Sequence, residues 1–187
     1  SQQEKDHFGQ LLFDFFWFSF FQLQAINADP HPGNFLFMAE GQLGALDFGC
    51  VRKLSEEFVE NFSKMIPEVV EVFYKNQSTE NLLRTYHQLQ FIEKDVTKQQ
   101  FDRDIIPYLK PYALWFGEAY ENTSFDFRAK TPCPGTPNTE SSVALKYLKG
   151  MYNEQFCFDR AHLGLMNLLT QIGAEVKTDW QKFRSAM

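Results

Sequence analysis

The sequence has few cysteines, little basic charge and no long uninterrupted apolar run. Its three cysteines, Cys50, Cys133 and Cys157, are widely spaced and form no C-x-x-C pair. They therefore indicate neither a disulfide framework nor a zinc site, and a reducing compartment is expected. Asp and Glu number 24 against 18 Lys and Arg, which gives a formal net charge of −6. This charge argues against a nucleic-acid-binding protein and against broad electrostatic attachment to anionic lipid.

One segment is unusually rich in aromatic residues, although aromatics already make up 17% of the chain. Residues 13–21 read F-D-F-F-W-F-S-F-F, with Asp14 inside the run and glutamines on both sides. A membrane-spanning helix needs about 20 apolar residues, so we exclude one here. Two interpretations stay open. The segment is either a core helix or an aromatic surface that faces lipid, a partner or a second copy in a homodimer.

The composition is that of a globular protein, with 44% hydrophobic and 22% charged residues. At this length we expect a single domain over residues 1–187. Lys5–Ile26 reads as a helix, and two short apolar runs, Phe35–Ala39 and Gln42–Leu46, read as a β-hairpin around a Gly-containing turn. The predicted fold class is mainly α with one small β-hairpin.

Helices are predicted for most of the remaining chain. Ser55 precedes two glutamates and is expected to cap a helix, which Pro67 should kink or break. Capping patterns also begin at Thr97 and Thr178. The further predicted helices are Thr79–Leu89, Thr97–Leu109, Pro111–Asn122, Glu140–Tyr152, Phe158–Gly173 and a short one after Thr178.

Two short segments carry the chemistry. Residues 28–34 read A-D-P-H-P-G-N, and residues 47–49 read D-F-G, with the predicted hairpin between them. Asn34 lies five residues after Asp29, and Asp47 lies thirteen residues after Asn34. Protein kinases have the same parts in the same order: an Asp as base, an Asn on one metal and a D-F-G aspartate on the other. Either segment alone would be weak evidence, whereas the ordered pair favours a phosphoryl-transfer site.

The residue types suit that chemistry. Magnesium takes oxygen ligands, usually one or two from carboxylates, and leaves the rest to water and phosphate. Asn34 and Asp47 would supply a neutral and a charged oxygen, which leaves Asp29 to accept a proton or to orient a hydroxyl or water. Two prolines and Gly33 stiffen and turn the loop between Asp29 and Asn34.

Residues 8–54 resemble the UbiB/ADCK family of atypical kinases, also called ABC-one, whose hallmark is an H-A-D-P-H-P-G-N loop, a hairpin and D-F-G. Residues 28–34 and 47–49 match completely, and Arg160–Leu165 looks like a weaker family feature. The resemblance implies the larger (carboxy-terminal) lobe of a protein-kinase-like fold, ATP and Mg²⁺ as cofactors, and a link to isoprenoid-quinone (ubiquinone biosynthesis) or lipid metabolism. It also implies a cytoplasmic location, peripheral to a membrane in some members and mitochondrial in a eukaryote.

The resemblance assigns roles to four residues. Asp29 corresponds to the catalytic-loop aspartate, and Asn34 and Asp47 to the metal ligands that hold the nucleotide. His31 stands where many protein kinases carry Lys, and contacts phosphate or braces the loop. The chain departs from the family at Asn27, where a commonly structural His is usual, and we interpret this change as tolerable.

The family's amino-terminal elements are absent. No Gly-rich phosphate loop and no V-A-I-K-like strand occur, although a kinase needs that lobe to clamp phosphates. We therefore expect a carboxy-terminal fragment of a longer protein, with Ser1 either a remnant of a tag or the product of natural processing. Alone, this fragment is expected to be inactive and to bind nucleotide weakly or not at all.

Three functions are compared. The first is an atypical kinase or ATPase that uses Asp29, His31, Asn34 and Asp47. The second is a non-catalytic scaffold that binds a partner or lipid through its Phe-rich helix. The third, and weakest, is a metal hydrolase that uses Asp29, His31 and Asp47.

Overall fold

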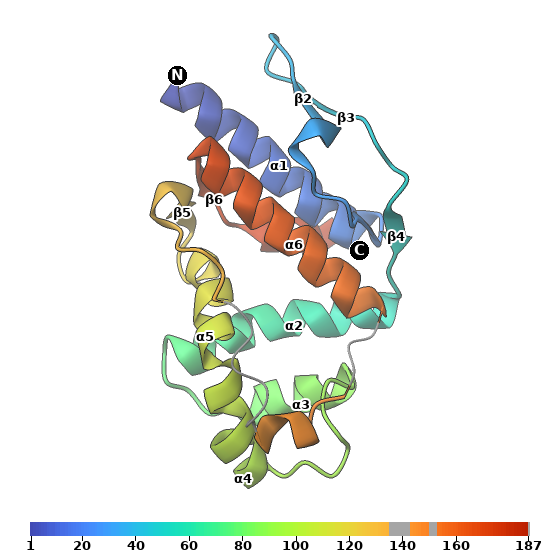
Figure 1. Cartoon of the computed structure of the whole chain (residues 1–187), viewed down its shortest axis with the longest axis vertical. Coiled ribbons are helices and arrows are strands. Elements are labelled where there is room, and N and C mark those ends of the chain that lie inside the picture. The colour runs from blue at the N-terminus through green and yellow to red at the C-terminus, as the bar shows by residue number, and fades with distance from the viewer. Residues whose placement is uncertain (135–142, 150–152, 187) are drawn as a thin grey trace. The chain divides into compact units, whose positions relative to one another are not determined.

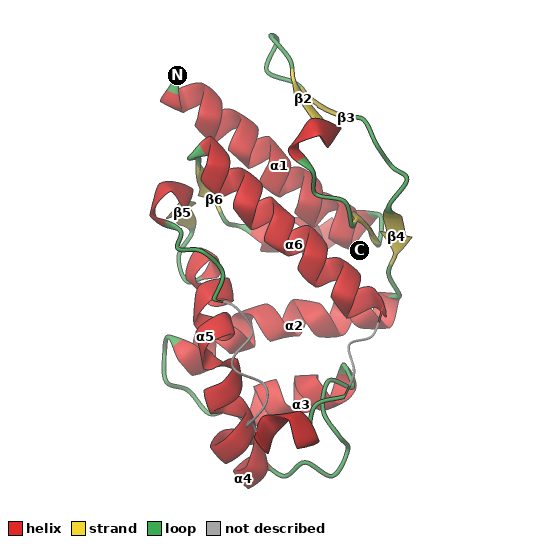
Figure 2. Cartoon of the chain, in the orientation of Figure 1, coloured by secondary structure: helices red, strands yellow, loops and turns green. Residues whose placement is uncertain are grey.

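The computed structural model describes residues 1–134, 143–149 and 153–186, and these are mostly helical with small pairs of strands (Figure 2). They divide into two compact units. The first consists of Ser1–Val59, Asn122–Lys130 and Tyr152–Met187, and the second of Glu60–Glu121 and Thr131–Met151. That residues 1–187 form a single domain stays a prediction.

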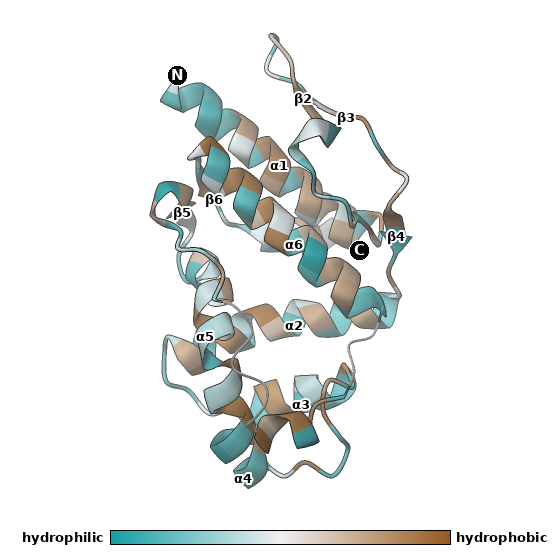
Figure 3. Cartoon of the chain, viewed as in Figure 1, coloured by the Kyte–Doolittle hydropathy of each residue, from teal (hydrophilic) through white to brown (hydrophobic). Residues whose placement is uncertain are grey.

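Two long helices that run in opposite directions are the largest elements of the first unit. α1 (Gln2–Gln22) and α6 (Asn153–Ile172) lie side by side, as Figure 1 shows. α1 begins with a capping box, in which Ser1 and Glu4 satisfy each other's backbone N–H groups. Figure 3 shows hydrophobic residues recurring along both helices. Their apolar faces form the core of this unit.

The core is aromatic and centres on Trp17. This side chain is fully buried, with its ring centroid 6.2 Å from that of Phe158 on α6 and 5.5 Å from that of Trp180. His162 is also buried and stacks on Phe158, and burial lowers the pKa of its imidazole to about 3. On α1, by contrast, Phe18 is 44% exposed. The Phe-rich segment is therefore chiefly a core helix. A homodimer or a lipid contact through this helix stays a prediction, for which Phe18 supplies an exposed ring.

No helix among the described residues is long and apolar enough to cross a membrane.

Three antiparallel strand pairs belong to the first unit. β1 (Ala25–Asn27) pairs with β4 (Val51–Lys53), β2 (Phe35–Phe37) with β3 (Leu43–Ala45), and β5 (Ser124–Asp126) with β6 (Glu175–Lys177). The β2–β3 pair is the predicted hairpin, two residues shorter in each strand. The prediction that the first helix extends to Ile26 is wrong. Gln24 has φ 47°, which ends the helical path, and the residues after it bond to β4.

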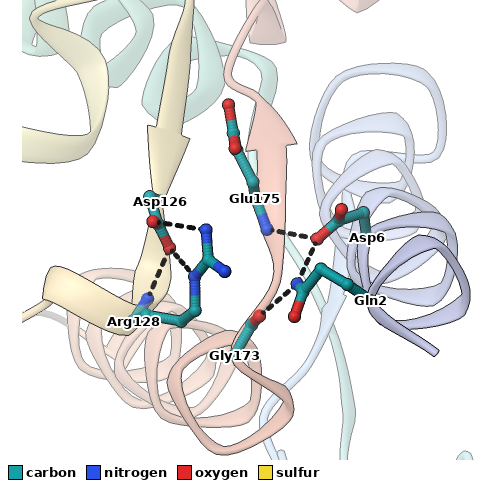
Figure 4. Close-up of polar contacts among 6 residues, drawn as sticks. All are labelled: Gln2, Asp6, Asp126, Arg128, Gly173 and Glu175. Atoms are coloured by element: carbon teal, nitrogen blue, oxygen red, sulfur yellow. Dashed lines mark hydrogen bonds and ion pairs between the residues drawn. The ribbon is translucent and has the colours of Figure 1, made fainter.

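A polar cluster joins the start of α1 to the turn after α6 and to β6 (Figure 4). The Asp6 carboxylate accepts hydrogen bonds from the Glu175 backbone N–H and the Gln2 amide, both at 2.8 Å. The Gln2 amide also donates to the Gly173 carbonyl at 2.8 Å. The backbone N–H of Glu175, above all, holds the pKa of Asp6 below its ordinary value.

The second unit is helical. α2 (Glu56–Phe73) begins in the first unit, and its residues from Glu60 onwards belong to the second unit. The elements that follow are α3 (Glu80–Gln88), α4 (Lys98–Gln100), a π-helical segment (Phe101–Ile105) and α5 (Ile106–Gly117). The Thr97 capping box is confirmed. So is the Ser55 cap, since its Oγ accepts from the Phe58 N–H at 3.2 Å. The predicted helix Glu140–Tyr152 is wrong over the described residues 143–149, where Val143–Lys146 form a 3₁₀ turn and Leu148 makes an isolated β-bridge with Ile92. The rest of that prediction lies outside the described residues.

Three further helix predictions are wrong. α2 runs through Pro67 and α5 through Pro111, so neither proline ends its helix, whereas a kink at Pro67 stays a prediction. A proline removes one backbone hydrogen bond, but buried apolar residues lie before and after both positions, and their burial favours a continuous helix. At Thr178 the hydroxyl donates to the Asn122 carbonyl at 2.8 Å instead of capping the 3₁₀ helix Trp180–Ala186.

α6 also carries a largely buried carboxylate, Asp159. Burial raises its pKa to about 6, and the 3.0 Å hydrogen bond from Gln155 offsets this only in part. The folded-state pKa is therefore above the unfolded value near 3.8, and the folded state holds the proton more tightly. The stability linked to this proton is complete below about pH 4 and is lost as the pH rises through 6.

Replacing Asp159 with Asn should therefore raise the free energy of unfolding at pH 7, by at most about 3 kcal/mol, and change it little at pH 4. Denaturant unfolding at the two pH values measures this. Asp126→Asn is the control with the opposite sign, since the Arg128 side chain lowers the pKa of that exposed carboxyl. A loss of stability at pH 7 in Asp159→Asn would contradict the assignment.

Candidate functional site

The first loop of the site begins directly after β1, and hydrogen bonds to its backbone N–H groups hold it in place. The Ala28 N–H donates to the Cys50 carbonyl at 3.1 Å, which extends the β1–β4 pairing by one residue. Pro32–Asn34 form a 3₁₀ turn whose amino end is capped by His31, because its Nδ1 accepts from the Gly33 N–H at 3.0 Å. His31 thus braces the loop, as one of the two predicted roles requires.

Asp29 and Asn34 contact each other directly. The Asn34 Nδ2 donates to the Asp29 carboxylate Oδ2 at 3.0 Å and to the Asp29 carbonyl at 3.1 Å. This orientation commits the nitrogen end of the amide to Asp29 and leaves its oxygen end for a cation. The two predicted roles, a carboxylate base and a neutral metal ligand, are therefore geometrically compatible.

Asp47 lies on the second loop, after β3, and is exposed. Its Oδ1 accepts a 2.7 Å hydrogen bond from the Gly49 N–H, which forms a tight local turn. The hairpin is attached to the first loop at its base, because the Leu46 N–H donates to the Asn34 carbonyl at 2.9 Å. The residue before Asp47 is thus bonded to the backbone of the other proposed metal ligand.

Asn27 joins the two loops with one side chain. Its Oδ1 accepts from the Asp29 N–H at 3.1 Å, and its Nδ2 donates to the Asp47 carbonyl at 2.7 Å. Both ends of the amide are used, one on each loop. In the sequence, Asn27 stands out only as a departure from the family's usual His. Its bridging role could not be read from the sequence, because it depends on a strand pairing 24 residues away, between β1 and β4.

A residue from α6 also reaches the site. The Arg160 Nη2 lies 3.7 Å from the Asp29 Oδ1, so the guanidinium faces the carboxylate oxygen that Asn34 does not contact. In the sequence, the segment from Arg160 onwards is only a weak family feature. Nothing in the local sequence links it to a loop some 130 residues earlier.

A mostly apolar hollow borders Asp29 and is closed by α1, α6 and the loop. Its lining includes Phe15, Phe16, Leu165 and Leu168, together with Asn27, Asp29 and Pro30. Asp29 therefore borders apolar side chains on one side, while its side chain remains 36% exposed to solvent.

The structure thus brings Asp29 and Asn34 together directly and links Asp47 to them through Asn27 and the base of the hairpin. His31 contributes a loop brace. The metal hydrolase interpretation needed Asp29, His31 and Asp47 to surround a metal. Among the residues that the structure describes, no group of three or more His, Cys, Asp or Glu side chains could hold one. A magnesium site built on one amide, one carboxylate and phosphate oxygens does not require such a group.

We predict that Asn27→Ala exposes the Asp29 backbone amide to exchange, because its acceptor is removed. Asn27→Asp should retain protection, since a carboxylate still accepts that hydrogen bond. Amide hydrogen exchange followed by NMR measures this, and the Gly49 amide, bonded to Asp47, serves as an internal reference. The alanine variant should also lose about 1 kcal/mol of unfolding free energy. Equal protection of the Asp29 amide in both variants would show that the bridge is not formed.

Similarity to known proteins agrees with this geometry. Residues 1–79 match the ABC1 atypical kinase-like domain. The Arabidopsis thaliana protein ACTIVITY OF BC1 COMPLEX KINASE 3, chloroplastic, is 33% identical over 109 residues, which cover 58% of this chain and 14% of that protein. ACTIVITY OF BC1 COMPLEX KINASE 1, chloroplastic, from the same plant is 31% identical over 106 residues, covering 56% and 14%. The chain thus matches about a seventh of the length of these relatives.

The fold is shared with a solved structure, that of the Rv3197–erythromycin complex from Mycobacterium tuberculosis. The TM-score is 0.70 at 19% sequence identity, and the alignment covers 97% of this chain and 44% of that one. The shared fold, mostly helical with small antiparallel strand pairs, confirms the predicted fold class, a mainly α kinase-like carboxy-terminal lobe with a small β-hairpin. The resemblance to the UbiB/ADCK family is likewise confirmed, because residues 1–79 match the ABC1 atypical kinase-like domain and the two plant relatives are about 30% identical.

Proposed function

We propose that this chain is the larger lobe of an atypical ATP-dependent kinase or ATPase of the UbiB/ADCK type. The observation that carries the proposal is the direct bond between Asn34 and the Asp29 carboxylate, on a loop that Asn27 joins to Asp47. Such an arrangement of base, amide and second carboxylate is the one that kinase-like phosphoryl transfer uses.

The donor set fits Mg²⁺ with ATP. The Asn34 amide has its nitrogen on Asp29 and its oxygen available, and Asp47 is exposed with one oxygen used by Gly49. One neutral and one charged oxygen suit a hard cation whose other ligands are phosphate and water. When bound, the cation would neutralise charge on the transferred phosphoryl group.

The chain's own residues supply positioning and proton transfer. Asp29 would accept a proton from an acceptor hydroxyl, or orient a water in an ATPase, with its carboxylate held by Asn34. His31 would keep the loop in place through the Gly33 N–H. Asn27 would hold the backbone of Asp47 at a fixed place relative to that of Asp29.

The biological setting is also part of the proposal. The family resemblance supports a role in isoprenoid-quinone or lipid metabolism, at a membrane surface or in an organelle, and the two Arabidopsis relatives are named as chloroplastic. The scaffold alternative relied on an exposed Phe-rich helix. It is less favoured, because most aromatic side chains of that helix are buried. The direct bond between Asn34 and Asp29 also favours a catalytic site over a scaffold.

In the complete protein that contains this chain, Asp47→Asn should lower the rate of ATP turnover by about 100-fold or more. The change removes a charged ligand while preserving shape, and such charge stabilisation contributes several kcal/mol to the transition state. Asp179→Asn makes the same chemical change at an exposed carboxylate of the same unit and should leave turnover unchanged. Phosphate release from ATP with Mg²⁺ measures both. Unchanged turnover in Asp47→Asn would overturn the proposed function.

A further inference from the structure

α6 contacts the candidate catalytic loop at two residues that are one helical turn apart. Arg160 lies beside Asp29, and Gly164, four residues further along α6, lies against Pro30. Residues at this spacing share one face of a helix. The face of α6 that carries Arg160 is therefore the face that packs on the loop.

The contact at Gly164 leaves no room for a side chain. A Cβ placed there would lie 1.9 Å from the Pro30 Cβ and 2.0 Å from its Cγ, far inside van der Waals contact. Glycine is what allows the helix to approach the proline ring this closely. Since Pro30 directly follows Asp29, this close contact sets the distance between the helix and the base.

The Asp29 carboxylate has a neighbour for each oxygen. Asn34 Nδ2 donates to Oδ2 at 3.0 Å, and the Arg160 Nη2 lies 3.7 Å from Oδ1. Arg160 is 56% exposed and Asp29 36% exposed, so this ion pair contributes little to stability. Its effect is on orientation, because a carboxylate with one oxygen hydrogen-bonded to Asn34 and the other facing the Arg160 guanidinium has one favoured rotation about its side-chain bond.

We propose that Arg160 is a positioning residue that, with Asn34, fixes the orientation of the Asp29 carboxylate for proton transfer. The inference rests on the proposed function and extends it. It places a necessary part of the site on α6, outside residues 1–79 that match the ABC1 domain.

The test has two readouts in the complete protein. Steady-state ATP turnover with Mg²⁺ should show that Arg160→Gln lowers kcat by about 5- to 10-fold while KM for ATP changes by less than about 2-fold, since orientation is lost and ground-state binding is retained. Arg160→Lys should recover part of kcat, because it keeps the positive charge without the planar donor geometry. Arg128→Gln is the matched control, an exposed arginine paired with Asp126 in the same unit, and should behave as the wild type.

The second readout needs no nucleotide. With ¹⁵N-labelled asparagine, the side-chain amide signal of Asn34 reports its hydrogen bond to the Asp29 carboxylate. Arg160→Gln should shift this signal toward the position it has in Asp29→Ala, whereas Arg128→Gln should not. Thermal unfolding should change little in Arg160→Gln, because its ion pair is exposed, and Arg128→Gln should lose only the small contribution of its surface pair with Asp126.

The outcomes separate the two proposals. If Asp47→Asn abolishes turnover while Arg160→Gln keeps the wild-type kcat and an unshifted Asn34 signal, the positioning role is overturned and the proposed function stands. A rise in KM for ATP with unchanged kcat also overturns it, because Arg160 would then bind the nucleotide. If Asp47→Asn leaves turnover unchanged, the proposed function itself fails.

Discussion

The arrangement of the candidate site depends on the hydrogen bonds of one amide side chain, that of Asn27. It accepts from the Asp29 N–H and donates to the Asp47 carbonyl, and thereby connects two loops that lie on either side of the hairpin. The base of the hairpin adds a second link, between Leu46 and Asn34. An Asn with both ends committed has one favourable orientation, so these bonds specify the relative position of the two loop backbones. Without them, the two loops would be linked only by the hairpin and by the β1–β4 pairing, which the Ala28–Cys50 bond extends.

The rigidity beneath the site has a different origin. Apolar and aromatic side chains from α1 and α6 pack around Trp17, and α6 approaches the catalytic loop as closely as Gly164 permits. Burial of large aromatic residues supplies most of the stabilising free energy in such a core. The polar contacts of the site are mostly exposed and contribute little to stability. Packing therefore holds the elements in place, and the hydrogen bonds orient individual side chains on them.

The sequence allowed the prediction of those features that depend on neighbouring residues. The A-D-P-H-P-G-N loop, the hairpin and the caps at Ser55 and Thr97 are all local, and the structure contains them. Features that depend on distant partners could not be predicted. The β1–β4 and β5–β6 pairs, the Asn27 bridge and the approach of Arg160 to Asp29 all join segments far apart in the chain. At Pro67 and Pro111 the local rule gave the wrong result, because buried residues on both sides favoured a continuous helix.

The central claim is that Asn34 and Asp47 hold one divalent cation together with a nucleotide. The most direct measurement uses the complete protein that contains this chain, replaces Mg²⁺ with paramagnetic Mn²⁺, which has similar ligand preferences, and records NMR line broadening in the presence of ATP. The account predicts that the strongest broadening falls on the amides of residues 29, 34, 47 and 49, and that it disappears in Asp47→Asn. Equal broadening at the exposed carboxylates Asp126 and Asp179, or broadening that persists in Asp47→Asn, would contradict it.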